Sequence, residues 1–390
     1  MRILYHHRTR GRDVEGVHIR GVVGALRELG HEVSVMSFPG ADPEQEQVHG
    51  RAVRSKGHGH LGALVSRMPG VLFEALELGY NLVTLVRMRR AFARSRPQLV
   101  YERYSLFLFA TVWLARRRGI PVVLEINDSA LVERVRPLWL KSLARRIERW
   151  CLRRATGLVF ISSYFRQQAE AAYGDIAPAV VSPNAADLAR FDPARHDRER
   201  LRAERGVAGR VVCGYVGAFV HWHGVNGFVE AVAARLDEAP ELVLLLVGDG
   251  RSLPEVRALV QARGLAGRIL LPGRVPHHEI PAWIACMDYA VLPDSNHYGS
   301  PVKLFEFMAM GVAMVAPDYA PVAEVVSDGR TGWLFPQRQL QACVQRVLEL
   351  AAQPAERQRV GAAAREYIVR ERQWRNNAEQ LLGLLPETRP

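Results

Sequence analysis

Long apolar runs and paired cysteines are both missing from this 390-residue chain. Because no stretch of about 20 uninterrupted apolar residues occurs, we expect no membrane-spanning helix. The cysteines are far apart in apolar surroundings, which predicts neither a disulfide framework nor a metal site. They are Cys151, Cys213, Cys286 and Cys343. The first residues, Met1–Tyr5, indicate a strand and not a signal peptide. These absences favour a reducing compartment, and we expect a cytoplasmic location.

Lysine is almost absent as well. Of the 52 basic residues only Lys56, Lys141 and Lys303 are lysine, and the others are arginine. The formal net charge of +12 favours anionic partners such as phosphorylated substrates, anionic lipids or nucleic acid. Aromatic residues are not interleaved with a basic stripe, as surfaces that bind single strands require, so we expect no nucleic-acid partner.

What is present is a regular alternation of short apolar strands and amphipathic helices, which predicts parallel sheets with helices on both faces. The first helix is expected over Arg20–Leu29, and residues 40–60 have the composition of a surface loop. The expected strands of the first set are Ile3–Tyr5, Val33–Met36, Leu99–Tyr101, Val122–Leu124 and Leu158–Ile161. Those of the second set are Val211–Val216, Leu242–Val247, Ile269–Leu271, Tyr289–Leu292 and Ala313–Ala316.

Two such sets predict an α/β protein of two Rossmann-like, doubly wound domains. We place an N-terminal domain at residues 1–185 and a C-terminal domain at 186–370, since the stretch between the two sets is polar and charged. We expect the two domains to face a central cleft, because ligands of open α/β sheets bind at the carboxyl ends of the strands.

The stretch Gly299–Gly311 is the most informative part of the sequence. Pro301 suits the first position of a short helix, and Gly311 suits the position just after its last turn. The free N–H groups of a first helical turn bind anions, and Lys303 adds a positive charge beside them. Glu306 follows one turn later and could accept hydrogen bonds from hydroxyl groups. An anion followed by a polyol is what a nucleotide sugar presents.

Other strand-to-helix turns leave the same end of the predicted second sheet. Gly217 and Gly248 each follow a strand, and His223 stands at a helix entrance where it could donate to a phosphate. Arg274-Val275 follows the third strand and could meet a base edge. A glycine after a strand is more often needed for the turn than for a ligand. The convergence of these turns at one sheet end nevertheless favours a ligand site.

Taken together, these motifs resemble the family 4 retaining glycosyltransferases, which have the two-domain GT-B fold. The likeness covers nearly the whole chain and is closest to the subset with Trp-His-Gly and Ser-Pro-x-Lys-x-Phe-Glu. It rests on Gly30–Val33, Val181–Asn184, Val247–Gly250, Leu271–Val275, Met287–Tyr289, Phe305–Ala309 and Asp328–Phe335. Residues 371–390 resemble the family's final helix, which crosses back to the N-terminal domain.

The resemblance implies sugar transfer from a nucleotide sugar, without a metal or other cofactor. Glu306 matches the second glutamate of the family's Glu-x7-Glu motif, and Tyr298 stands where the first would be. The family's diphosphate-binding Arg and Lys fall on Ala218 and His223, so His223 and Lys303 are expected to share the diphosphate.

The resemblance also assigns the remaining site residues. The expected catalytic residues are Lys303, His223, Glu306 and Asn127, the last of which stands where relatives have a catalytic His. The expected donor-binding residues are Gly16, Gly217, Gly248, Arg274, Val275, Tyr298, Gly299, Ser300, Pro301, Val302, Lys303 and Glu306. The expected acceptor-side residues are Arg12, Glu15 and His18.

We therefore expect a retaining hexosyltransferase of cell-surface polysaccharide or glycoconjugate biosynthesis. The alternatives are a nucleotide-sugar epimerase of the same fold, a relative that binds nucleotide without catalysis, and a basic nucleic-acid-binding protein. An epimerase would release a free sugar without an acceptor, and a nucleic-acid-binding protein would give a salt-sensitive gel shift.

One basic segment suggests a further partner. Arg134–Arg154 carries eight Lys or Arg residues, and apolar residues recur on another face at helical spacing, namely Leu140, Leu143, Ile147, Trp150 and Cys151. This pattern is typical of an amphipathic helix on an anionic lipid surface, here the inner face of the plasma membrane, where it would bring the enzyme to a lipid-linked acceptor. The alternative is a helix that packs its apolar face on the sheet and leaves its arginines in solvent.

Overall fold

The computed structural model of the chain describes residues 1–9, 13–38, 41, 68–132 and 137–386, and the predicted loop at residues 40–60 lies outside these ranges except for Ala41. The described chain forms two compact units. Unit 1 contains Met1–Pro183 together with Trp374–Pro390, and unit 2 contains Asn184–Gln373. The domain boundaries predicted from the sequence follow residues 185 and 370. They lie within three residues of the unit boundaries, which follow Pro183 and Gln373.

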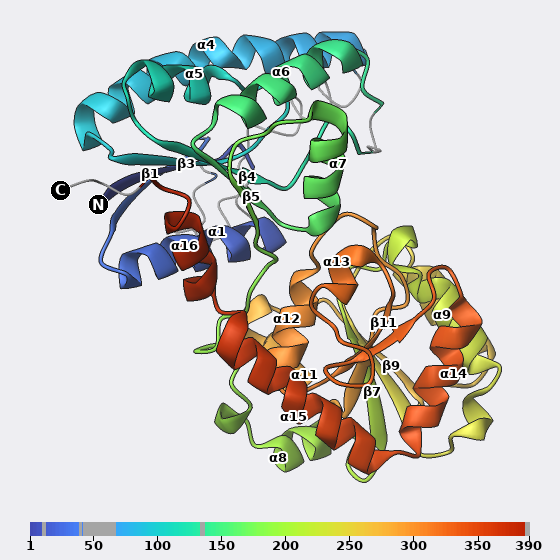
Figure 1. The fold of residues 1–390 in the computed structure, drawn as a ribbon. Helices are drawn as coiled ribbons and strands as arrows, with labels where there is room; N and C mark the ends of the chain where they lie inside the picture. Colours follow the sequence, from blue (N-terminus) through green and yellow to red (C-terminus); the bar gives the residue numbers. More distant parts are fainter. Residues whose placement is uncertain (10–12, 39–40, 42–67, 133–136, 387–390) are drawn as a thin grey trace. The chain divides into compact units, whose positions relative to one another are not determined.

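Unit 1 is built on a six-stranded parallel sheet with strand order β2-β1-β3-β4-β5-β6. Helices α4, α5 and α6 lie on one face of this sheet, and α1 and α16 lie on the other (Figure 1). The strands are β1 (Arg2–His6), β2 (Glu32–Met36), β3 (Leu99–Arg103), β4 (Val122–Ile126), β5 (Gly157–Phe160) and β6 (Ala179–Val181). The helices are α1 (Asp13–Glu28), α4 (Gly70–Ser95), α5 (Ala110–Arg117), α6 (Lys141–Arg154), α7 (Ser163–Tyr173) and α16 (Trp374–Leu382).

Unit 2 repeats this architecture with a second six-stranded parallel sheet, in the order β12-β11-β10-β7-β8-β9. Its strands are β7 (Val211–Val216), β8 (Leu242–Val247), β9 (Ile269–Gly273), β10 (Tyr289–Val291), β11 (Met314–Pro317) and β12 (Trp333–Phe335). Its helices are α8 (Arg198–Glu204), α9 (Val225–Ala233), α10 (Leu253–Ala262), α11 (Ile280–Ile284), α12 (Val302–Ala309), α13 (Ala320–Ala323), α14 (Leu340–Ala351) and α15 (Pro354–Glu371). Short 3₁₀ turns connect several of them, including η2 (His221–His223) and η4 (His277–Glu279).

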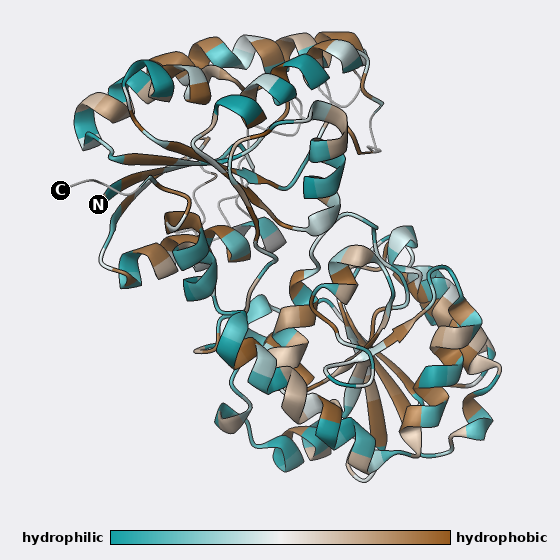
Figure 2. Ribbon diagram, in the orientation of Figure 1, coloured by the Kyte–Doolittle hydropathy of each residue, from teal (hydrophilic) through white to brown (hydrophobic). Residues whose placement is uncertain are grey.

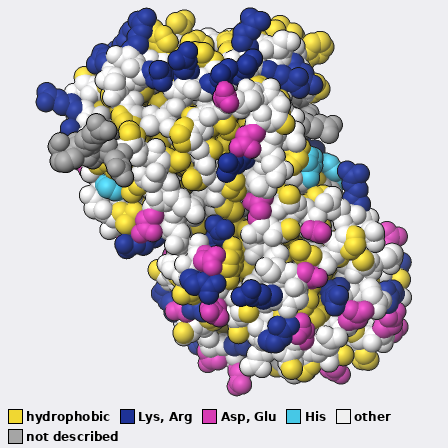
Figure 3. Space-filling model, in the orientation of Figure 1, with side chains coloured by type: hydrophobic (Ala, Val, Ile, Leu, Met, Phe, Trp, Pro, Cys, Tyr) yellow, Lys and Arg dark blue, Asp and Glu magenta, His cyan; other side chains and the backbone are white. Residues whose placement is uncertain are grey.

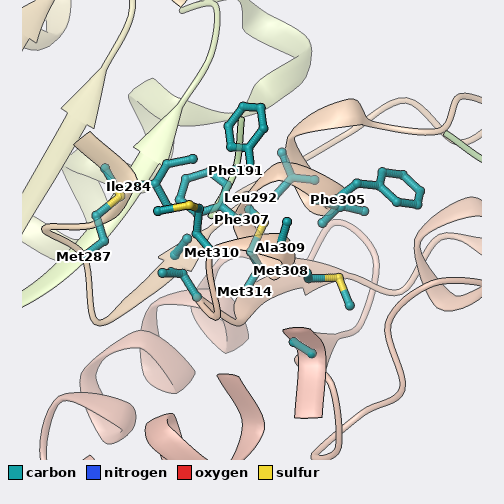
Figure 4. Packing of buried hydrophobic residues seen from close by; sticks show 14 of the residues in the cluster. Phe191, Ile284, Met287, Leu292, Phe305, Phe307, Met308, Ala309, Met310 and Met314 are labelled. Atoms are coloured by element: carbon teal, nitrogen blue, oxygen red, sulfur yellow. The ribbon is translucent and has the colours of Figure 1, made fainter. Parts of the chain in front are cut away.

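Apolar side chains from both faces of the unit 2 sheet form two buried clusters, and the strands are the most hydrophobic segments of the ribbon (Figure 2). Helix α12 lies inside one of these clusters. Phe305, Phe307 and Met308 are fully buried there, in the same cluster as Phe191 and Ile284 (Figure 4). Full burial of each such side chain contributes about 1.5–3 kcal/mol, so the cluster fixes the position of α12 and of the polar residues it carries.

Helix α16, from the far end of the sequence, packs against α1 in unit 1. The contact depends on Gly21, because a Cβ at this position would overlap the indole of Trp374. The Asn377 side-chain amide donates to the carbonyl oxygen of Pro183, 2.8 Å away, which anchors the helix a second time. None of the helices that the structure describes combines the length and the hydrophobicity that crossing a membrane would need.

Candidate functional site

The turn before α12 is held by hydrogen bonds that the sequence motif did not reveal. The side-chain oxygen of Asn296 accepts from the backbone N–H groups of Tyr298 (3.3 Å) and Gly299 (2.6 Å). The Ser300 hydroxyl oxygen accepts from the N–H of Asn184 (3.0 Å), and the Ser300 carbonyl accepts from the Asn184 side chain (2.6 Å). Three residues predicted to bind the donor thus already have hydrogen-bond partners within the protein.

Helix α12 begins one residue later than predicted. Pro301 precedes the first helical residue and has extended backbone angles, with φ −71° and ψ 112°, so Val302 opens the helix. At the other end the helix stops at Ala309, and Gly311 follows with φ +71°. This left-handed conformation is the one that glycine adopts without strain after a helix, as the sequence predicted.

Lys303 directs its ammonium toward the turn that follows β7. The Nζ atom lies 4.8 Å from the ring centroid of Tyr215. It also lies close to Gly217, since a Cβ at that glycine would be only 2.5 Å from Nζ. This Nζ is buried and has no hydrogen-bond partner among the described residues. Burial lowers the Lys303 pKa to about 8, although the charge of Glu306 opposes this shift. Since an ammonium has three donors, Lys303 retains donors for an anionic ligand.

His223 is held by the same tyrosine. Its Nδ1 lies 2.8 Å from the carbonyl oxygen of Ala218 and 2.9 Å from the Tyr215 hydroxyl, which lies 2.8 Å from the same carbonyl. A carbonyl oxygen can only accept, so Nδ1 must carry the proton. Burial, assisted by the charge of Lys303, lowers the His223 pKa to about 4. The neutral ring then presents a lone pair at Nε2, and donation to a phosphate requires a second proton.

Gly217 and Gly248 meet at the carboxyl ends of β7 and β8. Their φ angles are +156° and +143°, and a Cβ at Gly248 would overlap the carbonyl oxygen of Gly217. The Gly217 N–H donates to the carbonyl of Val247 (3.0 Å), and the Gly248 N–H donates to that of Gly273 (2.9 Å). The packing of the two turns therefore already explains both glycines, and their contact with a ligand stays a prediction.

Glu306 is almost fully buried, with 7% of its surface exposed. Its Oε1 lies 3.1 Å from Nε2 of His277, a residue of η4 that the sequence analysis did not single out. The segment predicted to meet the base edge lies just before this turn. Arg274 is exposed there, and Val275 is half-buried against the apolar cluster of unit 2.

The predicted N-terminal residues lie in unit 1. Asn127 directly follows β4 and is half-buried. Gly16, which the resemblance assigned to donor binding, lies in the first turns of α1, because this helix begins at Asp13 and not at Arg20 as predicted. Arg12 lies outside the described residues.

His18, predicted on the acceptor side, has intramolecular partners. Its Nε2 lies 2.7 Å from Oε2 of Glu125, and its ring packs edge-on against Trp374 with 5.0 Å between ring centroids. Glu15, almost one turn earlier on α1, is half-buried. These contacts explain the burial of His18, and the acceptor-side role of both residues stays a prediction.

Glu125 is the centre of a polar cluster that sequence reasoning missed. Its carboxylate accepts from Arg103 (2.7 Å) and from the Tyr101 hydroxyl (2.7 Å), in addition to its contact with His18. Burial would raise the Glu125 pKa, but the charges of His18 and Arg103 and hydrogen bonds from His18 and Tyr101 outweigh it and lower the pKa to about 2. The signal that could have revealed it is a carboxylate inside the apolar strand Val122–Ile126.

Each of the two units matches a known protein family. Residues 210–353 match the family described as "Glycosyl transferases group 1", and residues 15–185 match the "Glycosyl transferase 4-like domain". The chain is 27% identical over 372 residues to 2-deoxystreptamine glucosyltransferase of Streptomyces kanamyceticus, covering 91% of this chain and 94% of the relative. It is 30% identical over 354 residues to 2-deoxystreptamine N-acetyl-D-glucosaminyltransferase of Streptomyces fradiae, covering 87% of this chain and 82% of the relative.

The fold is shared with a solved structure, that of HepE from Anabaena in complex with UDP. The TM-score is 0.70 at 16% sequence identity, over 98% of this chain and 99% of HepE. This match and the two parallel six-stranded sheets confirm the predicted GT-B fold. Because both units match glycosyltransferase descriptions and the Streptomyces fradiae relative is 30% identical over most of its length, the chain belongs to the group 1 glycosyltransferases.

Proposed function

We propose that this glycosyltransferase takes its sugar from a nucleotide diphosphate sugar and transfers it with retention of anomeric configuration. The observation that carries the donor assignment is the buried ammonium of Lys303 in the first turn of α12, which has no hydrogen-bond partner among the described residues. Glu306 follows one turn further along. A cation followed by a carboxylate complements a diphosphate followed by ribose hydroxyls. The fold shared with HepE, which was solved with UDP, supports a nucleotide as the ligand.

In this proposal Lys303 and His223 stabilise the leaving diphosphate. Negative charge builds on its oxygens as the anomeric C–O bond breaks, so groups aimed there lower the barrier by about 2.7–4 kcal/mol each. His223 contributes a donor only after Nε2 takes up a proton, which a nearby diphosphate favours. Donor binding should therefore be accompanied by proton uptake.

The acceptor step needs no separate protein base. The new bond forms on the face from which the diphosphate leaves, and the proton of the acceptor hydroxyl passes to the departing phosphate oxygen. Asn127 is proposed to contact the reacting sugar through its amide. Glu306 is proposed to bind the ribose hydroxyls while it shares or gives up its contact with His277.

For the acceptor we propose a lipid-linked molecule of a glycoconjugate pathway, because α6 presents an unusually basic surface. The two curated relatives are named for 2-deoxystreptamine, a small soluble acceptor, which defines the competing class. Parallel transfer assays with a lipid extract and with 2-deoxystreptamine separate the two. Radiolabelled sugar that enters only the aqueous product would exclude the lipid-linked class.

A thermal-shift panel of nucleotide sugars identifies the donor, and NMR of the product reads its anomeric configuration. Glu306→Ala should weaken nucleoside diphosphate binding strongly, because hydrogen bonds to a charged group contribute about 1.5–3 kcal/mol. If the folded variant binds UDP and GDP with wild-type affinity, the assignment of Glu306 is wrong. A product of inverted configuration would contradict the retaining mechanism.

A further inference from the structure

The amphipathic pattern of helix α4 is inverted over its first 17 residues. The side chains buried against unit 1 are polar there, namely Glu74, Asn81 and Thr84. Large apolar side chains face solvent instead, with exposures between 47% and 70%. They are Val71, Leu72, Leu76, Leu82, Val83 and Val86. A surface helix normally turns its apolar stripe inward, so within the described part of the chain this stripe lacks its usual cover.

Specific hydrogen bonds hold α4 in this orientation. The Glu74 carboxylate accepts from the N–H groups of Trp139 (2.7 Å) and Leu140 (2.6 Å) at the entrance to α6. The Asn81 side-chain oxygen accepts from the N–H groups of Phe109 and Ala110, both at 3.0 Å, at the entrance to α5. Rotating α4 to bury its leucines would break these bonds and leave buried polar groups unpaired.

The same face is strongly basic. Helices α4, α5 and α6 together carry twelve Lys or Arg residues and three acidic residues. Glu74 and Glu148 are buried, and Glu77 lies 3.9 Å from Arg8, so these acids offset little of the exposed positive charge. Figure 3 shows Lys and Arg side chains beside hydrophobic ones over this part of unit 1.

Helix α6 supplies charge, while α4 supplies most of the apolar surface. Cys151, which the sequence placed on the exposed apolar face, is fully buried. A hollow of about 480 Å³ is lined by Arg146, Arg149, Trp150, Arg153 and Arg154. A smaller pocket of about 250 Å³ beside it is lined by Phe109, Arg146, Ile147 and Trp150. A cationic hollow next to an apolar pocket matches a lipid phosphate and the start of its hydrocarbon chain.

We propose that the face formed by α4, α5 and α6 docks on an anionic lipid bilayer. The apolar stripe of α4 enters the boundary between headgroups and acyl chains, and the arginines of α6 contact lipid phosphates. Charge complementarity favours a bilayer over a second copy of the chain, because two copies meeting here would bring their arginines together. The proposal does not depend on the proposed donor or mechanism.

Co-flotation of the full chain with vesicles tests this docking face. We expect binding to phosphatidylcholine mixed with phosphatidylglycerol, weaker binding as salt rises, and none to phosphatidylcholine alone. Changing Arg145, Arg146 and Arg149 together to Gln should lower the bound-to-free ratio roughly 100-fold. The triple variant Leu72→Gln, Leu76→Gln, Val83→Gln should lose binding yet keep its melting temperature, because these side chains are already exposed.

Matched controls in unit 2 separate a specific face from general charge and hydrophobicity. Arg200, Arg263 and Arg370 are exposed arginines, and their joint change to Gln should leave vesicle binding unchanged. Val369→Gln removes an exposed apolar side chain of unit 2 (42%) and should also have no effect. Equal binding to neutral vesicles, or no binding at all, overturns the proposal. Dimers that the α4 triple variant abolishes would identify the occupant as a second copy instead.

Discussion

The two units differ in whether a buried charge has hydrogen-bond partners. In unit 1 the Glu125 carboxylate is surrounded by Arg103, His18 and Tyr101, each within 2.7 Å. In unit 2 the Lys303 ammonium is buried with no hydrogen-bond partner in the described chain. A paired buried charge is needed for stability once its partners are in place, whereas an unpaired one costs stability and serves a ligand. Neutralising the two should therefore have opposite effects.

Glu125→Gln should give the largest loss of stability. The change leaves Arg103 buried without its counter-charge, which costs about 3–5 kcal/mol. The Glu125 pKa of about 2 lies below its ordinary value of 4.5, so its stabilisation is present above pH 4.5 and is lost as the pH falls toward 2. Urea unfolding between pH 2 and 7 measures both effects. Equal stability of variant and wild type at pH 7 would contradict the paired-charge account.

Lys303→Met should act in the opposite direction on stability while it damages the reaction. Donor turnover should fall about 100- to 1,000-fold, in line with the loss of one donor to a developing anion. The wild type should gain stability between pH 8 and 10.5, because the folded lysine loses its proton before the unfolded one, and the variant should not. Thermal melts across this range, together with single-turnover assays, test both. A variant that is less stable than wild type at pH 7 would break the contrast between the units.

Gly21→Ala tests whether the unit 1 cluster depends on α16. The new methyl group would overlap Trp374, whose indole packs on His18, and such overpacking costs about 1–3 kcal/mol. Gly24→Ala on the same helix is the matched control, since no atom of the described residues lies within 4 Å of a Cβ there. That change should stabilise by about 0.5–1 kcal/mol through helix propensity alone. Denaturant titration of both variants decides, and equal effects would mean that the α1–α16 contact is not tight.

The smallest expected effect is a pH dependence of donor binding. With a Lys303 pKa of about 8, UDP affinity should fall about fourfold between pH 7 and 8.5 as the ammonium loses its proton. At pH 7 the neutral His223 should take up a proton when UDP binds, which calorimetry in buffers of different ionisation enthalpy detects. His223→Gln should abolish that uptake. Binding without proton exchange in the wild type would show that Nε2 does not donate to the diphosphate.

The strands that the sequence predicted are the apolar ones. Val211–Val216 and Leu242–Val247 match β7 and β8 residue for residue, because both are continuous apolar runs. Two of the four edge strands, β6 and β12, were missed, and each has only three residues. Helix α1 was predicted too short because His18 and Gly16 interrupt its apolar spacing, although the helix buries them both.

Site residues that lie within a sequence motif could be predicted. Contacts between residues that are distant in sequence, which only the fold brings together, could not. Lys303 and His223 belong to recognisable turns of sequence. The Glu306 partner His277 lies 29 residues away from Glu306 in the sequence. Tyr215, which contacts both Lys303 and His223, is close to His223 in the sequence but far from Lys303. Contacts of this kind depend on which strand ends lie side by side, and single-sequence periodicity carries no such information.

Unit 1 is assembled from both ends of the chain, and this order matters during synthesis. Helix α1 leaves the ribosome long before α16, which covers it. Unit 2 comes from one continuous stretch between them, and all its strands are made before α16. Until α16 is made, the face of α1 that α16 will cover therefore stays exposed. During that time unit 1 is open to chaperones and to premature association.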